Sequence, residues 1–473
     1  MEICSSENNK WGINFVSFSK EYSVKINYTY VMTKVVQKLH DFVNLMDPEL
    51  NQIFNMSYAD AEKIVATGDP EKVRTIDGSF AIVTKQGHQV HMARSIGRPM
   101  RYFMAKQEAG PLLIVADRID DIYNYLKEID LHYQFRPDYT RMVPAHYVTR
   151  LDVVGCPDPN PDYKRYFTPQ RNRLNSDLDA IGEAYVGTMA NECNKWLDSI
   201  PKDEPIGVLF SGGIDSGSVF LVLYDLLLKR GESPARLKAF TLAVNGGPDG
   251  AQAYHFLDQL GLSIFHELFE GELSDLDYKE TIRVIEDYKQ RDVEAATMAL
   301  ALCKKIRERY PNWIYLADGD GGDENLKSYP IEDNPELTIR SVLSNPLLYH
   351  EGWGVDKIKH SLTYSGGQSR GHVRTYATAE RFGFKGFSPY TLPNVIEVSE
   401  GIPFIQLTDW KHDELYALKG EVVKRGIKAV TGFDMPVFPK RRMQHGTVAM
   451  EDFKKIFPDS EMVYRRYFSS LYS

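Results

Sequence analysis

Hydrophobic and polar residues follow two different patterns along the chain. Between residues 206 and 317, short hydrophobic runs alternate with longer segments in which hydrophobic residues recur every three or four positions. The short runs have the length of buried strands and are residues 206–210, 237–244, 264–269 and 313–317. The longer segments have helical periodicity and are residues 219–229, 251–260 and 281–309. Strands that alternate with helices are typical of a doubly wound parallel sheet, so we expect an α/β fold here.

The first 155 residues have a period closer to two. Hydrophobic and polar positions alternate in the stretches 12–18, 79–83, 90–93 and 112–115, which are separated by turns containing Gly and Asp. This alternation predicts a strand-rich α/β layer. Residues 178–197 return to helical spacing, and we expect one long helix there.

A proline-rich stretch separates these two patterns. Residues 155–169 contain four prolines, which remove backbone donors and disfavour both helices and central strands. We therefore expect a linker in this stretch and two domains, residues 1–160 and residues 161–473.

Composition and charge narrow the class of protein. The 473 residues include 56 Lys and Arg against 65 Asp and Glu, which gives a formal net charge of −9. This balance argues against nucleic acid as a partner, since broad binding to a phosphate backbone needs a basic face. It leaves room for a small basic pocket that binds a nucleotide.

The first ten residues and the cysteines predict a cytoplasmic location. Residues 1–10 lack the apolar run of a signal peptide, and hydrophobic runs such as 219–228 are too short to cross a membrane. The four cysteines, at positions 4, 156, 193 and 303, lie too far apart for a zinc site or a disulfide framework. We expect a cytoplasmic protein without a membrane partner, and assembly into a homo-oligomer stays open.

The first candidate site follows the strand 206–210. Residues 211–216 read Ser-Gly-Gly-Ile-Asp-Ser and lead into a helix. Glycines let the backbone approach an anion closely, and the N–H groups at the start of the helix point toward it. The carboxylate of Asp215 suits Mg²⁺ beside phosphates. This stretch predicts a phosphate-binding loop that differs from the lysine-containing P-loop.

The second candidate site is an acidic turn after the strand 313–317. Asp318, Asp320, Asp323 and Glu324 lie there among three glycines. Carboxylates so close together repel one another unless a cation or a substrate ammonium compensates their charge. A calcium loop and a solvated acidic turn are the alternatives.

The third candidate is a basic cluster near the C-terminus, residues 440–442, which reads Lys-Arg-Arg. By itself such a cluster is typical of solvated surface. It becomes informative only together with the other two motifs.

These motifs together resemble the asparagine synthetase family of N-type ATP pyrophosphatases. Residues 211–216 resemble the family's S-G-G-x-D-S pyrophosphate loop, and residues 318–324 resemble its S-G-E-G-S-D-E turn, with Asp320 in place of Glu. Residues 237–249 resemble the second strand and its turn, and Lys440 with Gly446 resembles a K-x5-G element. The stretches 76–83 and 93–99 resemble strands of the family's glutaminase domain.

The resemblance implies a fold and a cofactor set. We expect an N-terminal Ntn-hydrolase-like α/β sandwich followed by a doubly wound parallel-sheet ATP-pyrophosphatase domain. The implied cofactors are ATP and Mg²⁺, and the implied partner is a small amino-acid-like carboxylate substrate.

The N-terminal sequence departs from the family. A glutaminase of this class uses a cysteine at position 2, exposed by removal of Met1, and here residue 2 is Glu and the first cysteine is Cys4. The N-G-E-x-Y-N and G-G-D-x-E segments that hold glutamine are also missing. We expect an inactive glutaminase-like domain, as in the β-lactam and carbapenam synthetases.

The resemblance assigns roles to individual residues. The ATP-binding residues are Ser211, Gly212, Gly213, Asp215, Ser216, Leu242, Val244 and Gly319, with Leu242 and Val244 beside adenine. Asp215 and Asp323 would hold Mg²⁺. The catalytic candidates are Lys440, for negative charge on the reacting phosphate and acyl groups, and Asp320, for the amine. Glu380 is a further catalytic candidate that no family motif identifies. It lies in the helical stretch 373–382, and a salt-bridged helix face is the alternative interpretation.

The nature of the substrate stays open. Residues 286–297 resemble the family's E-T-Y-D-V-T-T-I-R-A-S-T, with Glu294 in place of Arg, and we expect this charge reversal near the pocket to disfavour plain aspartate. The favoured hypothesis is an AMP-forming ligase that makes an amide within one substrate molecule, like a lactam synthetase. The alternatives are ammonia- or glutamine-dependent amidation of the asparagine synthetase type, and an inactive regulatory paralogue.

Overall fold

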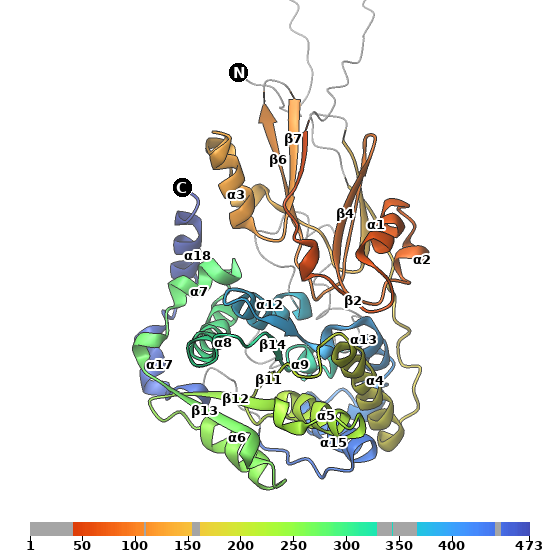
Figure 1. The fold of residues 1–473 in the computed structure, drawn as a ribbon, viewed down its shortest axis with the longest axis vertical. Helices are drawn as coiled ribbons and strands as arrows, with labels where there is room; N and C mark the ends of the chain where they lie inside the picture. The colour runs from red at the N-terminus through yellow and green to blue at the C-terminus, as the bar shows by residue number, and fades with distance from the viewer. Residues whose placement is uncertain (1–40, 108–109, 154–160, 329–342, 344–366, 440–445) are drawn as a thin grey trace, which may run out of the picture.

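The computed structural model describes residues 41–107, 110–153, 161–328, 343, 367–439 and 446–473 (Figure 1). Within this part of the chain, the N-terminal residues form two packed sheets, and the residues after position 177 form a parallel sheet with its helices. The overall class is α/β, as the hydrophobic pattern predicts.

The N-terminal part is a sandwich of two four-stranded sheets. One sheet has the order β1 (Asp41–Asn44), β7 (Gly110–Ala116), β6 (Arg101–Gln107), β8 (Arg141–Met142). The other has the order β10 (Asp162–Arg165), β9 (Tyr147–Asp152), β5 (Gln89–Arg94), β4 (Ala81–Gln86). Their facing side chains form one core, which includes Val83, Met92, Leu113 and Val115. The expected α/β sandwich is confirmed.

Helices cover the outer faces of this sandwich. Helices α1 (Tyr58–Ala66) and α2 (Pro70–Val73) pack against the β4–β5 sheet, and α3 (Ile119–Glu128) packs against β6 and β7 (Figure 1). A short ribbon of β2 (Gln52–Ile53) and β3 (Gly78–Ser79) lies beside them. The strands predicted at 79–83, 90–93 and 112–115 are confirmed, and the stretch 12–18 lies outside the described residues.

Part of the linker predicted over residues 155–169 is in fact a β-strand. Residues Asp162–Arg165 form β10, which pairs antiparallel with β9 at the edge of the sheet. Pro161 stands before the first strand residue, where the missing N–H costs the ladder nothing. The Arg165 guanidinium lies 4.7 Å from the centre of the Tyr147 ring, a cross-strand contact that the proline count could not reveal.

The C-terminal part is built on a five-stranded parallel sheet. Its order is β13 (His266–Gly271), β12 (Leu237–Val244), β11 (Ile206–Leu209), β14 (Tyr315–Ala317), β15 (Lys385–Phe387). Because β12 and β14 flank β11 on opposite sides, the direction of winding reverses beside β11. Ligands of such sheets bind at the carboxyl ends of the strands at this reversal.

Helices cover both faces of the parallel sheet, so the doubly wound prediction is confirmed. One face packs against α4 (Leu178–Asp198), α5 (Ile214–Lys229), α6 (Asp249–Asp258) and α15 (Glu414–Thr431). The other face packs against α8 (Gln290–Arg309) and α12 (Gly367–Glu380). The further helices are α9 (Gly322–Asn325), α13 (Pro393–Glu400), α14 (Phe404–Thr408), α17 (Met450–Ile456) and α18 (Glu461–Ser470).

The single helix predicted over 281–309 is wrong. The chain forms α7 (Tyr278–Ile285) and α8, and between them Glu286 adopts a left-handed backbone conformation with φ 51°. The Glu286 carboxylate accepts hydrogen bonds of 2.8 Å from the N–H groups of Ile119 and Asp120 at the start of α3. The break therefore joins the C-terminal part to the N-terminal sandwich.

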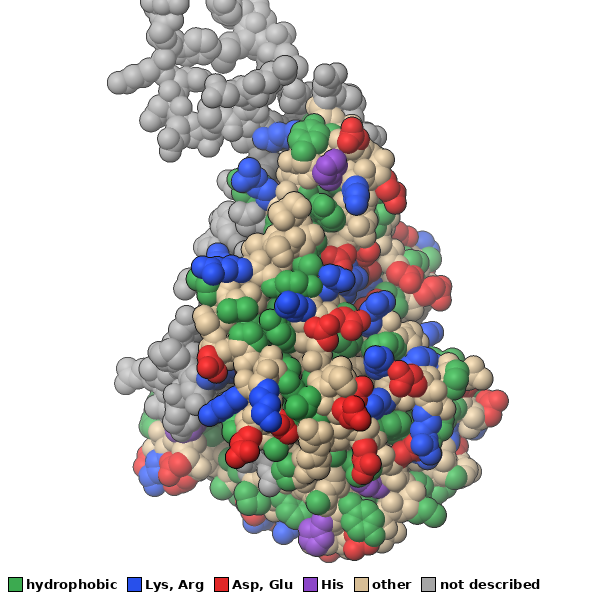
Figure 2. Space-filling model, turned by 90° about the vertical axis from the view of Figure 1, so that its left-hand side faces the viewer, with side chains coloured by type: hydrophobic (Ala, Val, Ile, Leu, Met, Phe, Trp, Pro, Cys, Tyr) green, Lys and Arg blue, Asp and Glu red, His purple; other side chains and the backbone are tan. Residues whose placement is uncertain are grey.

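Charged side chains of both signs lie on the surface of the described residues. On the face in Figure 2, Lys and Arg side chains lie interspersed with Asp and Glu side chains and do not gather in one patch. Among the helices of the described residues, none has the length and apolar character needed to span a membrane.

Candidate functional site

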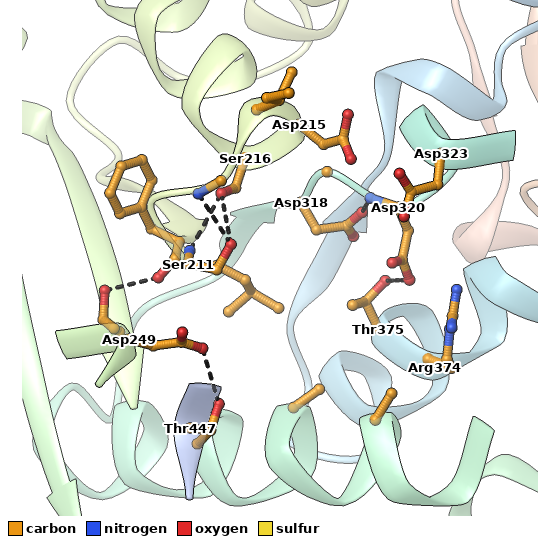
Figure 3. Close-up of a pocket in the computed structure, with 18 of the residues that line it drawn as sticks. Ser211, Asp215, Ser216, Asp249, Asp318, Asp320, Asp323, Arg374, Thr375 and Thr447 are labelled. Carbon is orange, nitrogen blue, oxygen red and sulfur yellow. Dashed lines mark hydrogen bonds between the residues drawn. The ribbon is translucent and has the colours of Figure 1, made fainter. Parts of the chain in front are cut away.

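A cavity of about 270 Å³ lies at the carboxyl ends of β11 and β14 (Figure 3). The loop after β11 lines one side of this cavity, and the acidic turn after β14 lines the other. The two strongest sequence motifs thus meet at the place where a doubly wound sheet binds its ligand.

The loop after β11 is tied to the start of α5. The Ser211 N–H lies 3.2 Å from the Ser216 hydroxyl oxygen, and the two serine hydroxyls are also 3.2 Å apart. Helix α5 begins at Ile214, so Asp215 and Ser216 stand in its first turn and both line the cavity. The N–H groups of a helix start are suited to phosphate oxygens.

Gly212 and Gly213 have different structural roles. Gly212 has φ 70°, and a Cβ atom there would lie 2.8 Å from the Cα atom of Ala253 in α6. This glycine is needed for the close packing of the loop on α6, and it is absent from the cavity lining. Gly213 lines the cavity, as the sequence predicts.

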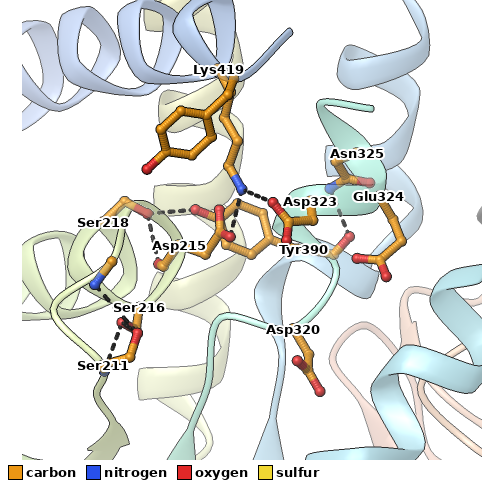
Figure 4. Close-up of polar contacts among 12 residues, drawn as sticks. Ser211, Asp215, Ser216, Ser218, Asp320, Asp323, Glu324, Asn325, Tyr390 and Lys419 are labelled. Carbon is orange, nitrogen blue, oxygen red and sulfur yellow. Dashed lines mark hydrogen bonds and ion pairs between the residues drawn. The ribbon is translucent and has the colours of Figure 1, made fainter. Parts of the chain in front are cut away.

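Asp215 and Asp323 meet across a lysine that the sequence analysis did not identify (Figure 4). The Nζ atom of Lys419 lies 2.6 Å from a carboxylate oxygen of each aspartate, and the lysine side chain is only 2% exposed. Burial disfavours the charged form of Lys419, but the two carboxylates outweigh it and raise its pKa above the usual range. The sequence did hold a signal, a charged residue on the apolar face of α15 between Leu415 and Val422.

This pair of carboxylates fits Mg²⁺ that arrives with phosphates. Mg²⁺ is commonly held by one or two protein carboxylates together with phosphate oxygens. Asp215 and Asp323 already hold the ammonium group of Lys419 between them. Over the described ranges, no group of three or more His, Cys, Asp and Glu side chains could hold a metal ion on its own. Asp215 and Asp323 are therefore the residues that could hold a metal ion together with a nucleotide.

A buried tyrosine supports both loops from behind. The Tyr390 hydroxyl lies 2.5 Å from the Ser218 hydroxyl in α5, and the Tyr390 carbonyl accepts a 3.0 Å hydrogen bond from Asn325 in α9 (Figure 4). Ser218 in turn donates to the Asp215 carbonyl at 2.8 Å. The two carboxylate-bearing segments are thus fixed relative to each other.

The acidic turn contains carboxyl groups with raised pKa values. Asp318 accepts hydrogen bonds from the Ser388 hydroxyl at 2.6 Å and from the Asp320 N–H at 2.9 Å. Burial raises the pKa of Asp318 to about 6 and that of Asp320 to about 7. The negative charges of Asp318 and Asp215 add to the rise for Asp320. Asp320 lines the cavity and is half-buried. A carboxyl group with such a pKa can exchange a proton near neutral pH.

Two residues of α12 complete this end of the cavity (Figure 3). The Thr375 hydroxyl donates a 2.9 Å hydrogen bond to Asp320. The Arg374 guanidinium lies 3.7 Å from carboxylate oxygens of both Asp292 and Glu324. The sequence analysis named neither residue, because α12 joins the site only through the tertiary fold.

The expected position of Glu294 near the pocket is wrong. Glu294 is buried, accepts a 2.9 Å hydrogen bond from Gln290 and is absent from the cavity lining. Arg291 and Ala295, which share another face of α8, line the cavity instead. The helical phase therefore turns Glu294 away and brings a positive charge to the pocket.

The remaining candidates are distributed unevenly. Leu242 and Gly319 line the cavity, whereas Val244 is fully buried and forms a bridge with Val448. Glu380 lines a second cavity, of about 800 Å³, between α3, α7 and α12 rather than the first. Lys440 lies outside the described residues, although the preceding residue, Pro439, lines the first cavity.

Comparison with known protein families gives a match over part of the chain. Residues 199–386 match the asparagine synthase family. This range contains both loops of the cavity, together with Arg291, Arg374 and Thr375. Lys419 lies beyond it.

Curated relatives match over a similar part of the chain. A probable glutamine-hydrolyzing asparagine synthetase of Acanthamoeba polyphaga mimivirus is 30% identical over 27% of this chain and 22% of its own length. The nodule asparagine synthetase of Pisum sativum is 32% identical over 27% of this chain and 22% of its own length. Asparagine synthetase B of Escherichia coli is 28% identical over 32% of this chain and 29% of its own length. The matched region thus spans less than a third of each relative.

Solved structures give much weaker matches. The NMN synthetase of Francisella tularensis is 15% identical over 33% of this chain and 60% of that chain, with a TM-score of 0.21. The U34-tRNA thiolase NcsA of Methanococcus maripaludis is 14% identical over 59% of this chain and 90% of that chain, also with a TM-score of 0.21. The sequence matches support a relationship to the asparagine synthase family for residues 199–386.

Proposed function

We propose that the protein is an ATP-dependent ligase that releases AMP and pyrophosphate. A carboxylate oxygen of the substrate attacks the α-phosphorus of ATP, and the bond to the β-phosphate oxygen breaks. An amine then attacks the acyl carbon of this acyl-adenylate, loses a proton and expels AMP, so that an amide forms. The observation that carries the proposal is the meeting of Asp215 and Asp323 across Lys419, directly beside the loop after β11.

The nucleotide end of the site is provided by β11, α5 and α15. Ser211, Gly213 and Ser216 offer hydroxyl and N–H donors to the leaving pyrophosphate at the start of α5. Lys419 supplies a buried positive charge at the same place. Asp215 and Asp323 would hold Mg²⁺, which neutralises phosphate charge when it is bound.

Asp320 is the proposed base for the amine. Its raised pKa allows the carboxylate to take a proton near neutral pH, and the hydrogen bond from Thr375 fixes one of its oxygens. Arg374 and Arg291 line the same cavity, and their positive charges would attract a substrate carboxylate. Lys440 stays a proposed stabiliser of the reacting phosphate and acyl groups.

The finer proposal is that the amine belongs to the same substrate molecule, as in a lactam synthetase. It is supported by the missing N-G-E-x-Y-N and G-G-D-x-E segments, since a chain that does not hold glutamine needs another source of nitrogen. Under this proposal the N-terminal sandwich is an inactive glutaminase-like domain. The alternatives are amidation with ammonia or glutamine, and a regulatory role without turnover.

Mass spectrometry of reaction products distinguishes these proposals. The full chain is incubated with ATP, Mg²⁺ and a panel of amino acids that carry a carboxylate and an amine able to form a ring, with and without ammonium. Ring closure predicts a product one water lighter than its substrate, with or without ammonium. A product that appears only with ammonium or glutamine contradicts the intramolecular proposal, and the absence of nucleotide turnover with every substrate favours the regulatory one.

A further inference from the structure

Helix α12 is attached to both halves of the molecule through consecutive residues. Thr375 donates its hydrogen bond to Asp320 in the candidate active site, at 2.9 Å. The next residue, Tyr376, has its hydroxyl oxygen 2.7 Å from an Nη atom of Arg98, which belongs to the N-terminal sandwich. The same turn of helix therefore contacts the acidic turn on one side and the N-terminal part on the other.

The N-terminal side of this contact is a buried ion pair. The Arg98 side chain is 1% exposed and lies 2.8 Å from a carboxylate oxygen of Asp117, just after β7. Arg98 also donates a 3.2 Å hydrogen bond to the Asp47 carbonyl. Arg98 is thus held by two segments of the sandwich before it reaches α12.

A buried charged hydrogen bond of this kind fixes geometry strongly. Removing one partner leaves a desolvated polar group unsatisfied, so the contact resists rotation and sliding of α12. Consecutive residues of a helix are about 100° apart around its axis, so a rotation that releases Tyr376 also displaces Thr375 from Asp320. This coupling between Tyr376 and Thr375 does not depend on glutaminase activity in the N-terminal part.

We infer that Arg98 is a positioning residue for the amine end of the candidate active site. It acts through Tyr376 and α12, and it places Thr375 and Arg374 against the acidic turn. The consequence for turnover rests on the proposed function, whereas the mechanical coupling of α12 to the sandwich does not. Under this inference the N-terminal sandwich contributes to the geometry of the candidate active site through Arg98.

Hydrogen–deuterium exchange of the full chain tests the coupling without any substrate. Tyr376→Phe keeps the ring and removes only the hydroxyl, and we expect the amides of residues 374–380 and 318–325 to exchange about tenfold faster, the loss of one buried hydrogen bond. Arg98→Met removes the same contact and also the ion pair with Asp117, so we expect at least the same acceleration in these segments. Adding Tyr376→Phe to Arg98→Met should then add little, because the Arg98–Tyr376 contact is already lost.

Arg74→Met is the matched control. Arg74 also joins the sandwich to the C-terminal part, through a 3.2 Å contact with Glu397 in α13, and both side chains are more than a third exposed. We expect this variant to leave exchange in α12 unchanged. Unchanged exchange in Tyr376→Phe, or equal acceleration in Arg74→Met, would overturn the inference.

A kinetic comparison tests the consequence for the reaction. Tyr376→Phe should lower kcat for amide formation about tenfold, while substrate-dependent ATP–pyrophosphate exchange and the KM for ATP stay at wild-type values. Amide formation at the wild-type kcat would contradict a positioning role. If the wild type turns over no carboxylate, the proposed function fails, and the exchange measurement still decides whether Arg98 positions α12.

Discussion

At the scale of single residues, the site contains a lysine that is kept charged close to carboxyl groups whose protonated form is favoured. Lys419 is kept charged by two aspartates, whereas Asp318, Asp320 and Glu324 have pKa values raised chiefly by burial. Groups whose pKa values are pushed apart in one cleft are typical of proton-transfer sites. The carboxyl groups on the nucleotide side and those on the amine side therefore suit different tasks.

The protonation of Asp320 predicts a pH dependence. Its pKa in the folded protein is raised to about 7, so the carboxylate that accepts a proton is lost as the pH falls below that value. We expect kcat for amide formation to rise with pH and to level off above about pH 7. In Asp320→Asn, amide formation should fall by about 10²–10⁴-fold and lose this pH dependence, while ATP–pyrophosphate exchange persists. An unchanged pH profile in Asp320→Asn would contradict the assignment.

The same pKa shift predicts the direction of an effect on stability. A carboxyl group whose folded pKa lies above its unfolded value stabilises the fold at low pH, and this contribution is lost as the pH rises through the folded pKa. Asp320→Asn should therefore unfold at a higher temperature than the wild type at pH 8, and the difference should shrink at pH 5. Thermal unfolding at the two pH values measures it.

At the scale of secondary-structure elements, two glycine contacts bring the acidic turn against the start of α5. A Cβ atom at Gly319 would lie 2.7 Å from the Ser216 nitrogen, and one at Gly322 would lie 2.2 Å from Oδ1 of Asp215. The two loops can approach this closely only because these side chains are absent. The approach is what lets Asp215 and Asp323 share one cation.

Gly322→Ala should therefore weaken nucleotide binding without unfolding the protein. The added methyl group meets the end of the flexible Asp215 side chain, which can move at little cost in stability but no longer stands opposite Asp323. We expect the Kd for Mg²⁺–ATP, measured by calorimetry, to rise about tenfold, equivalent to one lost charged hydrogen bond. Gly187→Ala is the control, since its new methyl group would have only the Val430 side chain nearby, at 4.0 Å. Equal affinity in both variants would show that the close approach is unimportant.

The elements also show what could be predicted from the sequence. The strand 237–244 is confirmed residue for residue, because its run of hydrophobic residues is buried between two helical layers. The break at Glu286 could not be predicted, since the N–H groups that stabilise it belong to Ile119 and Asp120, far away along the chain. Lys419 was missed for a similar reason, because both of its carboxylate partners come from other elements.

At the scale of the whole molecule, the N-terminal and C-terminal parts share a hydrophobic core. Ile119 and Ile122 of α3 pack in one cluster with Ile282 of α7 and with Tyr464 and Phe468 of α18 (Figure 1). The last helix of the chain thus returns to the N-terminal sandwich. The boundary near residue 160, which the prolines suggest, stays a prediction about domains and does not mark a separation of cores.

The shared core predicts that the C-terminal part is unstable alone. A fragment of residues 161–473 would expose the apolar faces of α7 and α18, so we expect it to be insoluble or to bind a hydrophobic dye strongly. The full chain should unfold in one cooperative transition. A soluble fragment that unfolds cooperatively at the temperature of the full chain would contradict this account.

The central claim, that a substrate carboxylate attacks the α-phosphate of ATP, is tested most directly by an oxygen label. The full chain is incubated with ATP, Mg²⁺ and a substrate panel labelled with ¹⁸O in the carboxylate groups, and the nucleotides are analysed by mass spectrometry. The acyl–oxygen bond breaks when the amine attacks, so the account predicts AMP that carries one ¹⁸O atom, together with unlabelled pyrophosphate. Formation of ADP with labelled phosphate, or of AMP without the label, would contradict it.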